Sequence, residues 1–106
     1  MTALTIAQLF NDARLNYPDL ANRLDRAEQI VIAQLRNPRA GWIRAKAAGG
    51  RIVYEVASNS RFDTFYTVDL DANRCECKWS QHKRTPCSHL LAVRFLRLVL
   101  AERQAA

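Results

Sequence analysis

The sequence has few of the residues that interrupt regular secondary structure. Its 106 residues include only three glycines, three prolines and one methionine, and charged residues make up 25% of the chain. We find no internal repeat and no low-complexity tract. This composition is ordinary for a globular domain and excludes collagen-like and disordered chains. No apolar run reaches the roughly 20 residues needed to span a bilayer, so we expect no membrane partner.

Acidic residues are scarce in the last third of the chain. The formal net charge is +6, and its distribution is uneven. Residues 1–40 carry a net charge of +1, residues 41–73 are neutral, and residues 74–106 carry +5. A concentration of positive charge in one segment favours a polyanionic partner such as nucleic acid.

Cysteine is scarce too, and all of it lies in one short segment. Cys75, Cys77 and Cys87 are the only cysteines, and an odd number cannot complete a disulfide framework. The chain starts without the basic and then apolar stretches of a secretory signal. We therefore expect an intracellular location, cytoplasmic or, in a eukaryote, nuclear, where disulfides are rare.

The three cysteines and His89 have the spacing C-x-C, nine residues, then C-x-H. Three thiolates and one imidazole form the ligand set of a closed, four-coordinate Zn²⁺ site. Residues i and i+2 of a strand share a face, so Cys75 and Cys77 can reach one ion together. Cys87 and His89 fall where a helix pattern begins, and its N–H groups and positive dipole end favour an anionic centre. The sequence predicts one structural zinc ion per chain.

Other interpretations of the same residues are possible. The cysteines could be buried and inert, or one could be a nucleophile with a histidine partner, which would leave the other two unexplained. His82, between the two ligand pairs, is an alternative to His89. A closed zinc site cannot activate water. Because we find no phosphate loop, nucleophile elbow or paired carboxylates, we predict that the protein is not an enzyme and has no small-molecule substrate.

The first 40 residues predict two helices. Apolar residues recur at helical spacing from Ile6 to Tyr17 and again from Leu20 to Leu35. Pro18 separates the two stripes, and Asn37 followed by Pro38 ends the second.

Beyond Gly41 the apolar period changes to two, which predicts strands at residues 42–47, 51–56 and 62–70 with turn residues between them. A final helix over residues 88–103 is apolar around most of its circumference, so we expect it to lie between the sheet and the first two helices. The predicted fold class is α+β: two N-terminal helices, a small antiparallel three-stranded meander leading into the zinc site, and a C-terminal helix packed on the sheet. We divide the chain into residues 1–40 and residues 41–106, which together form one compact unit.

The zinc segment resembles the SWIM zinc finger. The resemblance covers roughly residues 51–100 and is carried by residues 66–70, by Cys75 and Cys77, by Cys87 and His89 with a proline before them, and by the helix start at residues 90–93. It implies that these three cysteines and His89 are the zinc ligands. It also implies a module for DNA or protein interaction, as found in helicases, transposases and recombination accessory proteins. The two N-terminal helices are not part of the family motif.

The loop at residues 78–85 is the predicted contact surface. Basic residues there and nearby could neutralise phosphates, and Trp79 could stack on an unpaired base or instead pack beside the zinc. The predicted nucleic-acid-binding residues are Arg74, Lys78, Trp79, Lys83, Arg84, Arg94 and Arg97.

Two functions therefore remain open. One is a module that binds the phosphate backbone of DNA or RNA. The other is a protein adaptor of a recombination, transposition or helicase complex that docks through the zinc module or the N-terminal helices.

Overall fold

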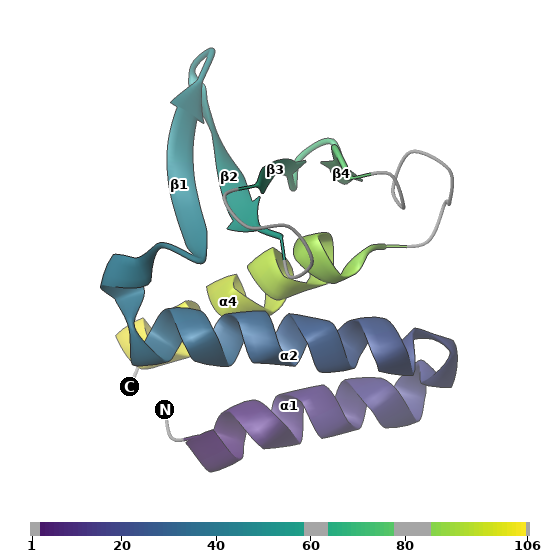
Figure 1. Ribbon diagram of the computed structural model, residues 1–106. Helices are drawn as coiled ribbons and strands as arrows, with labels where there is room; N and C mark the ends of the chain where they lie inside the picture. Colours follow the sequence, from purple (N-terminus) through teal and green to yellow (C-terminus); the bar gives the residue numbers. More distant parts are fainter. Residues whose placement is uncertain (1–2, 59–63, 78–85, 106) are drawn as a thin grey trace.

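The computed structural model describes residues 3–58, 64–77 and 86–105. In this part of the chain three long helices lie on one side of an antiparallel sheet (Figure 1). No described helix is long and apolar enough to cross a membrane. The elements in chain order are α1 (Ala3–Asn16), η1 (Pro18–Leu20), α2 (Ala21–Arg36), η2 (Pro38–Ala40), β1 (Ile43–Ala48), β2 (Arg51–Ala57), β3 (Phe65–Asp69), β4 (Arg74–Cys75) and α4 (Ser88–Ala105).

The two predicted N-terminal helices are present as α1 and α2, and Pro18 opens the short 3₁₀ turn between them. The apolar stripe of α1 buries Ile6 and Phe10 in the core. Tyr17, which we placed on the same stripe, is instead 61% exposed. It follows the last residue of α1, so the helical period that would have directed it inward no longer applies.

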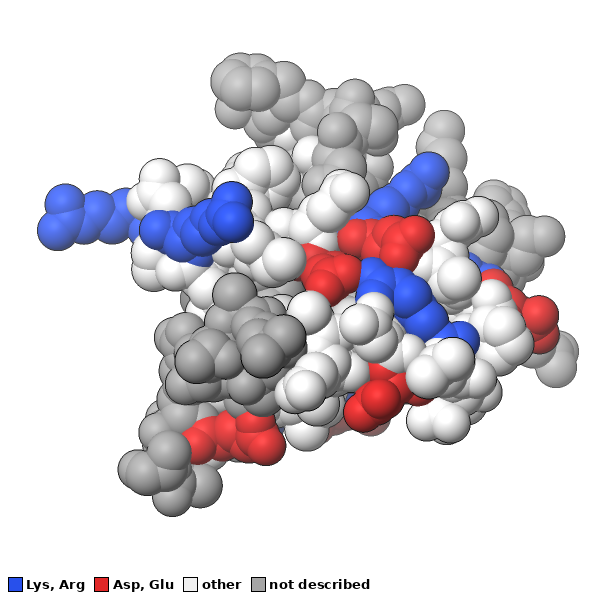
Figure 2. Space-filling view, turned by 90° about the horizontal axis from the view of Figure 1, so that it is seen from below, with Lys and Arg blue, Asp and Glu red and all other residues white. Residues whose placement is uncertain are grey.

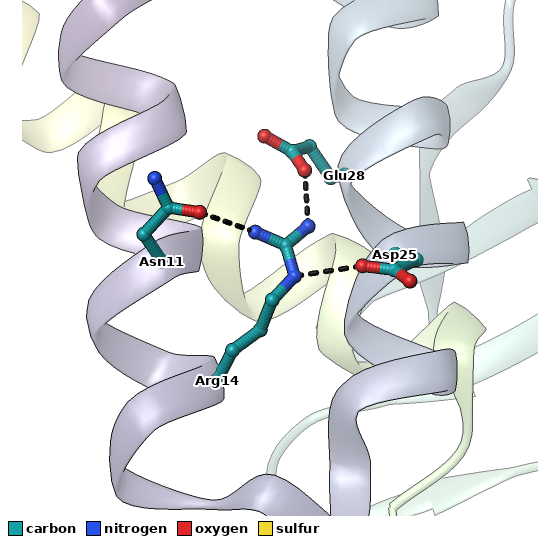
Figure 3. Close-up of polar contacts among 4 residues, drawn as sticks. All are labelled: Asn11, Arg14, Asp25 and Glu28. Carbon is teal, nitrogen blue, oxygen red and sulfur yellow. Dashed lines mark hydrogen bonds and ion pairs between the residues drawn. The ribbon is translucent and has the colours of Figure 1, made fainter.

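Arg14 joins α1 to α2 (Figure 3). Its Nε donates to Asp25 Oδ1 at 2.7 Å, its Nη1 donates to Asn11 Oδ1 at 2.8 Å, and its Nη2 pairs with Glu28. The hydrogen bond to Glu28 raises the pKa of Arg14 above its ordinary value, against the opposing effect of burial. Because the guanidinium stays charged, the two helices are joined by a permanent charge-assisted contact.

The sheet has the strand order β1-β2-β3-β4, with every neighbouring pair antiparallel. β1 and β2 are joined at Gly49 and Gly50, whose φ values of 57° and 81° fit the two positive angles of a type I′ turn. The predicted meander had three strands, and the structure adds a fourth. Asn73 adopts a left-handed φ of 54°, which reverses the chain so that β4 pairs with the end of β3. A strand of two residues is too short to show an alternating pattern in the sequence.

The C-terminal helix lies where the sequence predicts it. α4 packs against α2 on one side and against β2, β3 and β4 on the other. Phe95 of α4 also stacks on Phe10 of α1 with ring centroids 4.3 Å apart. A single hydrophobic core therefore draws on all three long helices and on the inner face of the sheet, with Val56 and Val68 fully buried in it.

Candidate metal centre

Two of the sulfur atoms come from the last strand of the sheet. Cys75 ends β4 and pairs with Val68. The Glu76 N–H donates to the carbonyl oxygen of Thr67 at 3.1 Å, so strand pairing continues one residue further. The side chains alternate accordingly, with Cys75 and Cys77 buried and Glu76 exposed. Both thiols are thereby directed to the inner face of the sheet, toward α4.

The other two ligand candidates lie at the start of α4. Cys87 directly precedes the helix, and its Sγ accepts a hydrogen bond from the Leu90 N–H at 3.4 Å. Its carbonyl oxygen accepts the Leu91 N–H at 3.1 Å. Cys87 therefore occupies the N-cap position and uses sulfur where serine or aspartate would use oxygen. His89 lies in the first turn, where the positive end of the helix dipole favours an anionic centre.

The four side chains converge on one point. Their ligand atoms all lie within 4.8 Å of one another. His89 turns Nδ1 toward the sulfurs, 3.8 Å from Cys87 Sγ and 3.9 Å from Cys75 Sγ. A tetrahedral zinc ion with Zn–S near 2.3 Å and Zn–N near 2.0–2.1 Å separates sulfur from nitrogen by about 3.6 Å. None of the three cysteines, all of which lie in the described residues, forms a disulfide. The donor set and its spacing fit a closed Cys₃His zinc site.

The surroundings of Cys75 determine the protonation of the site without metal. A hydrogen bond with the Cys87 side chain, followed by burial, raises the pKa of the Cys75 thiol well above its ordinary value. The neutral form of the Cys75 thiol is therefore favoured in the metal-free protein. Zinc binds thiolates, so its binding must displace protons from this cluster.

Two further residues reach the site from outside the ligand motif. The Tyr66 ring lies 4.8 Å from the His89 ring, with an angle of 44° between the ring planes. Arg23 of α2 donates from Nη1 to the carbonyl oxygen of Pro86, the residue before Cys87, at 3.2 Å. Neither contact was predicted from the sequence. Arg23 and Pro86 are 63 residues apart, and no local spacing pattern signals a pair so distant in sequence.

The basic residues predicted near the zinc are only partly described. Arg74, Arg94 and Arg97 are all exposed. Arg94 of α4 donates from Nη2 to Asn73 Oδ1 at 2.8 Å, which ties it to the residue before β4. Arg97 follows Arg94 one helical turn later. Arg74 itself pairs with Asp69 and lies on the face of the sheet opposite Cys75. The remaining predicted contacts, and the alternative ligand, lie outside the described residues: Lys78, Trp79, His82, Lys83 and Arg84.

The helical side of the molecule has a different charge pattern. Seen from below Figure 1, acidic and basic side chains lie next to one another with uncharged surface between them (Figure 2). Interspersed charges of both signs do not make a field that attracts a polyanion.

Comparison with protein families agrees with this site. Residues 66–93 match the SWIM zinc finger. The matched segment contains all four converging side chains, and together they support one structural zinc ion per chain. A SWIM zinc finger is a zinc-binding module of nucleic-acid or protein interaction. The search of curated proteins and the search of solved structures found no match.

Proposed function

Because residues 66–93 are a SWIM zinc finger, we propose that this protein is a nucleic-acid-binding module held together by zinc. Cys75, Cys77, Cys87 and His89 are the four ligands, and the basic residues beside them contact the phosphate backbone. The observation that carries the proposal is the hydrogen bond from Arg94 to Asn73. It fixes Arg94 of α4 at the turn before β4, next in sequence to Arg74, close to the strand that carries Cys75.

Charge supports this choice. Residues 74–106 hold a net charge of +5 of the total +6, and a bound Cys₃His–Zn centre subtracts about one unit. Arg74, Arg94 and Arg97 of this segment are exposed. Exposed guanidinium groups can neutralise phosphates and release condensed counterions, which binds nucleic acid without reading its sequence.

The same site argues against catalysis. Four protein ligands leave zinc no open position for water or substrate. We therefore propose a binding protein and not an enzyme, with no small-molecule substrate. Three cysteines that form no disulfide also favour a reducing, intracellular setting, cytoplasmic or nuclear.

A salt titration tests the proposal. Binding of labelled DNA and RNA, single- and double-stranded, is measured by fluorescence anisotropy at several salt concentrations with zinc-loaded protein. If four to six phosphates are engaged, log affinity falls with log salt at a slope of roughly −4 to −5. Arg94→Gln should weaken binding to every sequence alike and reduce the slope by roughly one. A salt-independent affinity, or no binding at all, contradicts the proposal.

One observation favours a second function, that of a protein adaptor. Leu15 and Tyr17 at the end of α1 are 80% and 61% exposed, and their apolar surface could dock a protein. The partner would belong to a recombination, transposition or helicase complex. In this case the isolated chain binds no nucleic acid, and a partner that purifies with it is lost in Leu15→Ser but retained in Arg94→Gln.

A further inference from the structure

We propose that the outer face of the sheet is a stacking platform for single-stranded nucleic acid. The proposal rests on the nucleic-acid-binding function proposed above and adds a second contact surface, built on aromatic residues. The described helices all pack on the opposite, inner face, where Val56 and Val68 enter the core (Figure 1). No described helix covers the outer face.

Two aromatic residues share one row of this outer face. The Ala57 N–H donates to the Trp42 carbonyl oxygen at 2.8 Å, so Trp42 lies opposite Ala57, and Ala57 pairs in turn with Phe65. Trp42 and Phe65 are half-buried, and neither packs against the hydrophobic core. The inner-face tyrosines, Tyr54 and Tyr66, do pack against it. The row Trp42, Ala57, Phe65 therefore carries aromatic surface that the core does not use.

The space above the row suits a flat group. Neighbouring strands lie about 4.8 Å apart, so two strand spacings, roughly 10 Å, separate the backbones of Trp42 and Phe65. Between them Ala57 offers only a methyl group. The Arg44 guanidinium already lies over the Phe65 ring, 4.0 Å from its centroid. This cation covers one face of the Phe65 ring, and Arg44 is itself exposed. Because nucleobases stack on guanidinium planes as well as on aromatic rings, a base can stack on Arg44 above Phe65.

The charged residues on this face and the geometry of stacking together determine which form of nucleic acid it can bind. The strand register places Lys46, Arg74, Glu55 and Asp69 on it, and Arg51 pairs with Asp69 at 2.9 Å. With Arg44 and Arg51 included, the four basic residues outnumber the two acidic ones, so this face carries an excess of positive charge. Stacking needs a free base face, which a duplex does not offer. The platform therefore selects unpaired bases, and removing a ring changes no charge, so the stacking contact adds little salt dependence.

The test compares three variants with the intact, zinc-loaded chain. Phe65→Leu and Trp42→Leu keep apolar bulk but remove the ring, while Ile52→Ala, exposed on the other face of the same hairpin, is the matched control. Anisotropy titrations use a labelled single-stranded oligonucleotide and a duplex, each at two salt concentrations. We expect each ring variant to bind the single strand roughly tenfold more weakly, with the salt slope and duplex binding unchanged. The control should bind both like wild type.

A second measurement leaves the rings in place. In Trp79→Phe protein, Trp42 is the remaining tryptophan, and stacking of a base on it should quench its fluorescence. Normal single-strand binding by the ring variants, or an unchanged Trp42 signal on saturation, overturns the platform and leaves the proposed phosphate contacts of the arginines intact. Failure of the wild-type chain to bind any nucleic acid would instead remove the proposed function itself.

Discussion

The Nη1 of Arg23 lies 3.2 Å from the carbonyl oxygen of Pro86 and donates a hydrogen bond to it. Pro86 immediately precedes Cys87, so a residue of α2 holds the backbone that presents the third sulfur. Arg23 lies outside the segment that matches the SWIM zinc finger. In this protein the N-terminal helices thus contribute to the shape of the metal centre.

This contact predicts that α2 affects zinc affinity. In Arg23→Ala the Pro86 carbonyl loses a charged donor, and the Cys87 backbone can move away from the tetrahedral position. Residues that orient metal ligands typically change affinity by 10–100-fold, and because Arg23 acts through the backbone we expect a loss of up to about tenfold. Competition with a chromogenic chelator measures it. Arg26→Ala, an exposed arginine of the same helix, is the control and should bind zinc normally. Equal affinities in the two variants would show that the contact does not position the ligand.

Zinc removal should unfold the metal segment. A structural zinc site in a small finger contributes on the order of 10–16 kcal/mol. This is comparable with the whole stability of a small domain, roughly 5–15 kcal/mol. We expect chelation to melt at least residues 75–95, with loss of helical circular dichroism and a lower Tm, and re-addition of zinc to restore both. An unchanged spectrum and melting curve after verified zinc removal would contradict a structural metal.

The raised pKa of Cys75 predicts opposite pH dependences with and without metal. Zinc must displace thiol protons, so its affinity should rise with pH across about pH 6 to 8. Without metal, the folded state favours the neutral thiol. That contribution is fully present below the ordinary pKa of 9.0 and is lost as pH rises above it toward the folded-state value. Calorimetric zinc titrations in two buffers of different ionisation enthalpy count the released protons. A pH-independent zinc affinity would show that the thiols are already ionised.

The bridge between α1 and α2 should stabilise the helix pair. Arg14→Gln removes the partner of Glu28, whose side chain is only 19% exposed, and leaves that carboxylate without its charge-assisted contact. We expect a loss of about 1–2 kcal/mol in the free energy of unfolding by urea. Asp25 is 56% exposed, so Asp25→Asn is a matched control that should cost less than about 0.5 kcal/mol. A similar loss in both variants would assign the effect to general helix changes and not to the Glu28 contact.

Local patterns in the sequence predicted most of the fold. Apolar residues at helical spacing predicted α1, α2 and α4, and alternation with turn residues between predicted β1, β2 and β3. The errors lie where the pattern is short or ends. β4 spans two residues, and its pairing depends on the left-handed Asn73. Tyr17 lies beyond the helix whose spacing placed it inward.

By itself the sequence determined the chemistry of the metal centre and the concentration of positive charge near it. Each pair of ligands is two residues apart, one pair on a strand and the other at a helix start. The local backbone conformation positions each pair, and neighbouring residues determine that conformation. Only the tertiary structure brought Arg23 to Pro86, Arg94 to Asn73, and Trp42 into one row with Phe65. Those pairs lie 20 or more residues apart in the chain. The packing of α4 between the helices and the sheet set the contacts of Arg23 and Arg94. Strand register set the row that holds Trp42 and Phe65. No short pattern of residues encodes helix packing or strand register.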